Sequence, residues 1–134
     1  MANNIAAWYE KEILDHMLGV GSFTMPTTLH IGLFKADPGE TGDLTNEVST
    51  SGTAYVRQPV TFTAAAGQPA ATSNNADITF PQATADWGTV THIGIMNQTA
   101  TGTMLFYGVL TASKTVNSGD TFKIPTADLD VTLN

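Results

Sequence analysis

Asp86 and His92 are candidates for chemistry in the stretch FPQATADWGTVTHIGIMN at positions 80–97. An aspartate that orients a histidine is the start of a general acid–base site. However, no serine or threonine is specially placed as a nucleophile, and the chain has no G-x-S-x-G turn, Gly-rich phosphate loop or H-E-x-x-H helix. A structural interpretation is therefore favoured. Asp86, Trp87 and Gly88 form a turn, and Trp87 is a structural anchor that is buried against the following strand.

The histidines are also candidates for metal ligands. His30 and His92 lie in similar short segments, and imidazole binds zinc, copper and nickel. A metal centre needs a third ligand of matching spacing, and none accompanies them, while His16 lies apart near the N-terminus. We therefore expect no metal and no cofactor.

Acidic residues offer two other kinds of site. The loop acids Asp37, Glu40, Asp43 and Glu47 could bind a hard cation such as calcium, but their spacing matches no EF-hand. A solvated acidic loop is the better interpretation.

The pair Asp128 and Asp130 invites comparison with the two carboxylates of a glycosidase. On one strand their Cβ atoms would lie about 7 Å apart, which does not exclude that chemistry. A glycosidase also needs a substrate cleft with distinct environments for acid and nucleophile, for which a chain of this size has little room. We expect that the protein is not an enzyme.

The composition excludes several partners. The 134 residues include 12 acidic and 5 basic residues, which gives a net charge of −7, and there is no cysteine. Such a chain cannot build a basic groove for nucleic acid, and it forms neither disulfides nor thiolate sites. No apolar run reaches the roughly 18 residues of a membrane span, and the N-terminus lacks a signal-peptide pattern. Only 13% of residues are charged, which is typical of a surface that is partly covered by neighbours or built from strands.

The N-terminal residues predict a helix over 3–18. Asn3 or Asn4 can cap its start, and Gly19 can end it. The helix either packs on the protein's own sheet or docks on a partner. The apolar residues expected to contact such a partner are Ile5, Trp8, Tyr9, Ile13 and Met17. Residues 1–25 are thus predicted to form an N-terminal helix or arm.

Residues 26–134 are predicted to form a mainly β domain, an antiparallel β-sandwich or barrel-like fold. Pro59 places its strand at a sheet edge or at a bulge, because proline cannot donate to the ladder. The Ala-rich residues 64–76 are expected to form a flexible or partner-ordered loop. The strands are expected at 29–34, 55–63, 76–80, 89–96, 103–110, 121–124 and 129–133.

Two details of these strands predict contacts. LHIGLF and THIGIM place Gly32 and Gly94 on the same faces as His30 and His92, so we expect bulky groups to pack over the glycines. Tyr55 and Arg57 share one face of their strand, and Arg57 is expected to bond a loop carboxylate such as Glu47. With Trp87, they are the predicted structural anchors.

Short motifs follow one another in order along residues 29–134. They are an aliphatic strand ending in ADPG, a Glu-Val-Ser loop, Tyr-x-Arg-Gln-x-Val-x-Phe, a Trp-Gly before the histidine strand, and Leu-Phe-Tyr-Gly-x-Leu-Thr. In this order the chain resembles small structural proteins of tailed bacteriophages, described as tail-fibre-like or head-decoration proteins. The resemblance implies a non-enzymatic virion component of β-sandwich type, assembled in the cytoplasm of the host bacterium.

Two positions in the virion follow from this resemblance. The first is a capsid decoration or cement protein that contacts the major capsid protein, which is favoured because the chain lacks a fibre repeat or coiled-coil heptads. The alternative is a tail or fibre component that touches the host surface. In either position we expect a homo-oligomer, and the general architecture of virions, rather than any residue pattern, favours a trimer.

Overall fold

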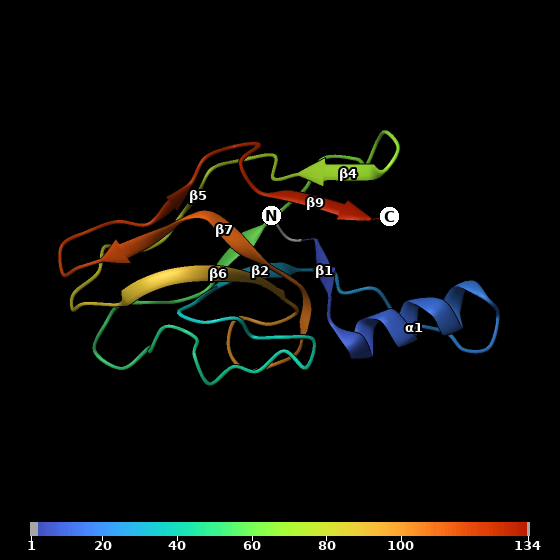
Figure 1. The fold of residues 1–134 in the computed structure, drawn as a ribbon, viewed down its shortest axis with the longest axis horizontal. Helices are drawn as coiled ribbons and strands as arrows, with labels where there is room; N and C mark the ends of the chain where they lie inside the picture. Colours follow the sequence, from blue (N-terminus) through green and yellow to red (C-terminus); the bar gives the residue numbers. More distant parts are fainter. Residues whose placement is uncertain (1–2, 134) are drawn as a thin grey trace.

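The computed structural model describes residues 3–133 and is mainly β with one N-terminal helix (Figure 1). Its elements follow the order β1 Asn4–Ile5, α1 Ala7–Met17, β2 Leu29–Phe34, β3 Gln58–Val60, β4 Ala70–Ser73, β5 Ile78–Thr79, β6 Gly88–Met96, β7 Met104–Val116, β8 Lys123–Ile124 and β9 Asp130–Leu133. No helix in this described part of the chain has the length and apolar character needed to span a membrane.

The strands form one larger sheet and two small antiparallel pairs. The five-stranded sheet has the order β1-β7-β6-β2-β3, and β4–β9 and β5–β8 form the separate pairs. Both small pairs lie on one side of the five-stranded sheet in Figure 1. The two layers enclose a core in which Ile31 and Ile93 of the large sheet join Phe122 and Leu129 of the opposite layer. This confirms the predicted β-sandwich type of architecture, whereas the described strands do not close into a barrel.

β2 and β6 are neighbouring inner strands of the five-stranded sheet. They pair antiparallel with Gly32 directly opposite Gly94. A Cβ atom on Gly94 would lie 2.7 Å from Met104 Cε and 3.0 Å from Phe34 Cε1, so the space over these glycines is filled as expected. Phe34 and Met104 belong to a second, smaller apolar cluster on this face of the sheet, away from the main core.

The predicted helix start was wrong. Asn4 and Ile5 form β1, pairing with Tyr107 and Phe106 of β7, and the backbone N–H of Ala6 donates to Leu105 O at 2.8 Å. The helix therefore begins only at Ala7, and no side chain caps it. Long-range pairing has taken the residues that local sequence assigned to the first helical turn.

The predicted end of the helix agrees with the structure. The helix ends at Met17, and Gly19 follows with φ of +74°, a left-handed conformation that glycine adopts without strain.

The predictions for Pro59 and for the loop 64–76 had different outcomes. Pro59 lies in β3 at the edge of the five-stranded sheet, as predicted. Residues 64–76 are not entirely loop, because Ala70–Ser73 forms β4 against β9. The hydroxyl of Thr72 also donates to Thr63 O at 2.6 Å. Small residues with little apolar bulk are thus ordered by backbone pairing.

Candidate interaction surface

The most elaborate polar cluster is buried and centres on Arg57. Its Nε and Nη2 atoms donate to Glu47 Oε1 and Oε2, both at 2.7 Å, which gives the bidentate pair expected from the sequence. The Tyr55 hydroxyl donates to Glu47 Oε1 at 2.8 Å and accepts from Leu33 N at 2.9 Å. Burial, and then the charge of Glu47, raise the pKa of Tyr55, so the hydroxyl stays protonated and keeps donating.

The remaining arm of Arg57 fixes a turn. Its Nη1 atom donates to Gln98 O at 3.0 Å and to Thr101 O at 2.6 Å. Thr101 has φ of +50°, a left-handed conformation that costs free energy for a β-branched residue. The guanidinium therefore holds β3, the Glu47 loop and the turn between β6 and β7 together. All of these contacts lie within the chain, so the cluster is structural.

Trp87 and Asp86 have structural roles as well. Trp87 is only 3% exposed, and its indole N–H donates to Thr53 O at 2.8 Å. Asp86 Oδ1 accepts a hydrogen bond from Ser118 N at 2.8 Å, while His92 Nδ1 lies 2.8 Å from Thr91 Oγ1. The two residues that suggested acid–base chemistry thus bond to different neighbours.

The two strand histidines do not come together. β2 and β6 are neighbours, but the residue opposite His92 is Phe34, four positions from His30 along β2. Four strand residues span about 13 Å, too far for both rings to bind one metal ion. His30 is 8% exposed and its Nδ1 atom has no hydrogen-bond partner. Burial, and then the positive charge of Arg57, lower the pKa of His30.

Three of the four loop acids stabilise the loop itself or its neighbours. Asp37 Oδ1 accepts from Gly39 N at 2.9 Å, Asp43 Oδ1 accepts from Thr45 N at 2.9 Å, and Glu47 pairs with Arg57. Within residues 3–133, no group of three or more His, Asp or Glu side chains is arranged to hold a metal ion.

The C-terminal acids lie on an open surface. Asp128 and Asp130 are both exposed and line a shallow hollow of about 460 Å³. Neither carboxyl group lies in a buried setting that would separate an acid from a nucleophile. A nearby acid has a structural partner, because hydrogen bonding to Lys123 and Thr126 lowers the pKa of Asp77 to about 2.

The first turns of α1 are anchored to the sheet by aromatic residues. Tyr9 is 4% exposed and its ring lies 5.8 Å from that of Phe106, edge to face. The indole N–H of Trp8 donates to Met104 O at 2.6 Å. Phe23 returns from the loop after the helix and packs against both, 6.2 Å from Trp8 and 5.4 Å from Tyr9 between ring centroids.

The far end of α1 and the residues after it are exposed. Figure 1 shows α1 projecting from the side of the β body. We call four side chains at this end the apolar tip; they are 57% to 77% exposed and comprise Leu14, Met17, Leu18 and Val20. Such a concentration is typical of a contact surface rather than of scattered surface residues.

The structure separates the five residues that were predicted to contact a partner. Ile5 lies in β1, Tyr9 is buried, and Trp8 and Ile13 are half-buried, so they contribute to the fold. Met17 is the one that lies at the exposed end. Three tip residues were missed, namely Leu14, Leu18 and Val20. Leu14 and Leu18 lie four residues apart, outside the i, i+4 row that Ile5, Tyr9, Ile13 and Met17 form in the sequence, and this spacing was a readable signal.

Hollows of different character lie near the base of α1. One, which we call the apolar hollow, has a volume of about 270 Å³ and opens between the two layers. It is lined by Tyr9, Met25, Pro26, Leu29, Phe62, Thr72, Ile95, Leu105, Phe106 and Val131.

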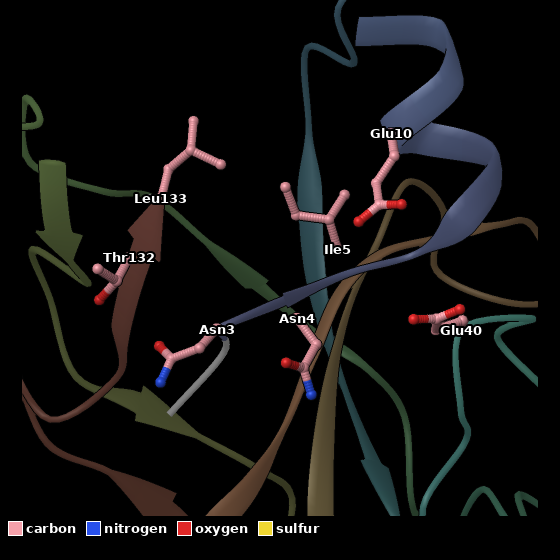
Figure 2. A pocket seen from close by; sticks show the side chains of 7 residues that line it. All are labelled: Asn3, Asn4, Ile5, Glu10, Glu40, Thr132 and Leu133. Carbon is pink, nitrogen blue, oxygen red and sulfur yellow. The ribbon is translucent and has the colours of Figure 1, made fainter. Parts of the chain in front are cut away.

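Another hollow, of about 330 Å³, lies between the first and last strands (Figure 2). Thr132 and Leu133 of β9 flank one side, and Ile5 of β1 and Glu10 of α1 flank the other. Its remaining lining residues are Asn3, Asn4 and Glu40. Its walls are mixed polar and apolar, whereas the lining of the apolar hollow is almost entirely apolar.

The model of a protein family described as podophage GP4 fiber I protein gp80 matches residues 4–132. The match therefore includes the helix, strands β1 to β8 and all of β9 except its last residue. No curated protein matches the chain.

Proposed function

The chain belongs to the family of podophage GP4 fiber I protein gp80, and from this premise we propose that it is a structural component of a fibre on the phage virion. The family match makes it a bacteriophage virion structural protein, in agreement with the resemblance seen in the sequence. The finer assignment to a fibre rests on the description of the family. The protein acts through binding to other virion proteins and without catalysis, and it is assembled in the cytoplasm of the host bacterium.

The arrangement of the molecule supports a structural role. The buried polar groups of the Arg57 cluster and the indole of Trp87 bond within the chain. The exposed apolar surface is concentrated on the projecting end of α1, where Met17 is 73% exposed. A rigid body with one apolar projection is suited to joining subunits of an assembly.

The capsid position, which the sequence favoured, lacks such support. The family description names a fibre, and no observation on the fold favours the capsid surface. Attachment to the major capsid protein therefore stays a prediction from the sequence, and the alternative predicted there becomes the proposal.

Virion fractionation tests the proposal. Purified virions are separated into tails and tail-less heads, and the protein is quantified in each fraction by mass spectrometry against the major capsid protein. A fibre component separates with the tails, in tens of copies per virion at most. Retention on tail-less heads in a copy number close to that of the major capsid protein would overturn the proposal and support the decoration role.

A further inference from the structure

The hollow between β1 and β9 lies between two strand edges that have no neighbouring strand on that side. β1 is the terminal strand of the five-stranded sheet, and β9 pairs only with β4 among the described strands. Figure 2 shows β1 on the side of β9 that lies opposite to β4. The free edge of the large sheet and the free edge of β9 therefore border the same hollow.

The pairing register shows which backbone groups of β9 point into this gap. In an antiparallel pair, every second residue bonds to the partner strand, and the residues between them direct their N–H and C=O groups away from it. Ala71 of β4 directs both groups away from β9, because it bonds to Ala66 with N···O distances of 2.9 and 3.0 Å. Thr132 lies opposite Ala71 in the register. Its N–H and C=O groups therefore also point away from the pair, toward the hollow that Thr132 lines.

β1 directs a second set of backbone groups outward. The N–H of Ala6 donates to Leu105 O at 2.8 Å, so Ile5, the residue before it, is a position that does not bond to β7. No hydrogen bond among residues 3–133 occupies the outward backbone groups of Ile5 or Thr132. Unpaired N–H and C=O groups along a strand edge are a template for an added strand.

The charge of the hollow indicates which kind of strand it takes. Its seven lining residues include Glu10 and Glu40 and no Lys, Arg or His. Both glutamates are exposed, and neither forms an ion pair with a basic residue of the described chain. Burial, and then the charges of Glu40, Asp37 and Glu10, raise the pKa of Tyr107 on β7, so these carboxylates gather at this end of the sheet. Their complement is a basic side chain.

The hollow also offers an apolar contact. Leu133 at the end of β9 is 52% exposed, and Ile5 across the gap is half-buried. Successive side chains of a strand point to opposite faces. An added strand can therefore direct a basic side chain to the glutamates and the next side chain, an apolar one, to Leu133.

We propose that an extended, basic segment of another virion protein pairs with the free edge of β9 in this hollow. Its backbone bonds to Thr132, a Lys or Arg side chain reaches Glu10 and Glu40, and an adjacent apolar side chain contacts Leu133. A second copy of the chain is a poor occupant, because each copy carries a net charge of −7. The inference rests on the proposed fibre role only for the source of the segment.

Titration of the purified full chain with a synthetic peptide tests the site. The probe is acetyl-Thr-Val-Lys-Val-Thr-amide, which has strand-forming residues and one central lysine. Its binding is followed by NMR, and the backbone amide signals of Ile5 and Thr132 should shift the most. The same peptide with glutamate in place of lysine should bind at least about tenfold more weakly, because it brings a like charge to Glu10 and Glu40.

A proline pair tests the role of the strand edge. Thr132→Pro removes an N–H that the chain itself does not use, so the protein should keep its thermal stability and bind the lysine peptide at least about tenfold more weakly. Val131→Pro is the matched control. It removes an N–H that bonds to β4, so it should lower the thermal stability of the fold itself.

A charge reversal tests the choice of peptide and leaves the backbone unchanged. Glu40→Lys should weaken binding of the lysine peptide and strengthen binding of the glutamate peptide. Asp128→Lys changes the net charge equally at an exposed residue outside the hollow, and it should leave the preference as in the wild type. This comparison remains decisive if Thr132→Pro does not fold.

Four outcomes would overturn the proposal. The first two are an absence of shifts at Ile5 and Thr132 up to the solubility limit of the peptide, and equal binding of the two peptides. The third is an Asp128→Lys variant that changes the preference as much as Glu40→Lys does. The fourth is self-association of the wild type that Thr132→Pro abolishes, because the occupant would then be a second copy. The titration uses the isolated chain, so a failed fibre assignment and a failed site are separate results.

Discussion

Two clusters of four aromatic residues each have different structural roles in this protein. The first comprises Tyr55, Phe80, Trp87 and Phe122, all at most 4% exposed, and it lies in the core between the two layers. The second comprises Trp8, Tyr9, Phe23 and Phe106, and of these only Tyr9 is fully buried. The first completes a core, whereas the second fastens a projection to that core.

The two clusters differ in whether the groups around them have partners within the chain. Around the first cluster, the Trp87 indole and the Tyr55 hydroxyl both have partners in the chain. Beyond the second cluster, the helix continues into the apolar tip, whose side chains face solvent. Large apolar side chains left in solvent forgo about 1.5–3 kcal/mol each of burial free energy, which a partner can supply.

The largest expected effect is that of Trp87→Ala. Removing a fully buried indole should lower the free energy of unfolding by about 3–5 kcal/mol, measured by urea denaturation. Trp87→Phe is the matched control, because it keeps a buried six-membered ring and loses the smaller part of the indole together with its N–H bond to Thr53 O. A loss below about 1 kcal/mol for the alanine variant would mean that the first cluster is not essential to the core.

Arg57→Ala should follow closely. It leaves Glu47 without its cation, in a pair whose side chains are only 2% and 14% exposed. The loss should lie near the lower end of about 3–5 kcal/mol, since the Tyr55 hydroxyl still donates to Glu47. Lys123→Ala breaks an ion pair that is half-exposed and should change stability little. Equal effects of the two variants would contradict the structural role of the buried pair.

Trp8→Ala tests the second cluster and should have an intermediate effect. Trp8 is half-buried, so the expected loss is about 2 kcal/mol, roughly half that of Trp87→Ala. Hydrogen exchange should then accelerate in α1 and much less in β6, because the cluster holds the helix rather than the sheet. Uniform acceleration throughout the chain would remove the distinction between the two clusters.

The smallest effect concerns pH. The pKa of His30 is lowered in the folded state by burial and by Arg57, the charged group near it, while the unfolded chain has the ordinary value near 6.5. The unfolded state therefore binds the proton first, and stability is lost as pH falls below about 6.5. His30→Leu should lose less stability than the wild type between pH 7 and pH 5, measured by thermal unfolding. Parallel losses in the two proteins would refute this origin.

Much of the β body could be predicted, because the positions of its strands depend on patterns within short stretches of sequence. Alternation located β2 and β6, and the glycines in both indicated a crowded face that Phe34 and Met104 fill. The Arg57–Glu47 pair followed from the side on which Arg57 emerges and from the acids of the preceding loop. Each of these inferences needed only a strand period and one complementary group.

The remaining elements depend on distant pairing. β1 is only two residues long, and it forms because it pairs with the edge of β7. The local sequence does not reveal this pairing, and Asn3 or Asn4 was therefore predicted to cap the helix. β4 is built from Ala, Thr and Ser, and its order comes from β9, about sixty residues later. The apolar tip was only partly predicted. Tyr9, Ile13 and Met17 form an i, i+4 row in the sequence, but this spacing does not show at which residue the helix loses contact with the sheet.

The short β1 strand also has a mechanical consequence. Two residue pairs join β1 to β7, whereas eight pairs join β7 to β6. A tensile load applied at the N-terminal end of the chain acts first on β1, which has only these two residue pairs to resist it. In a single-molecule pulling experiment we expect β1 and the helix to detach at low force while the two-layered body stays intact, so that the joint yields before the domain does.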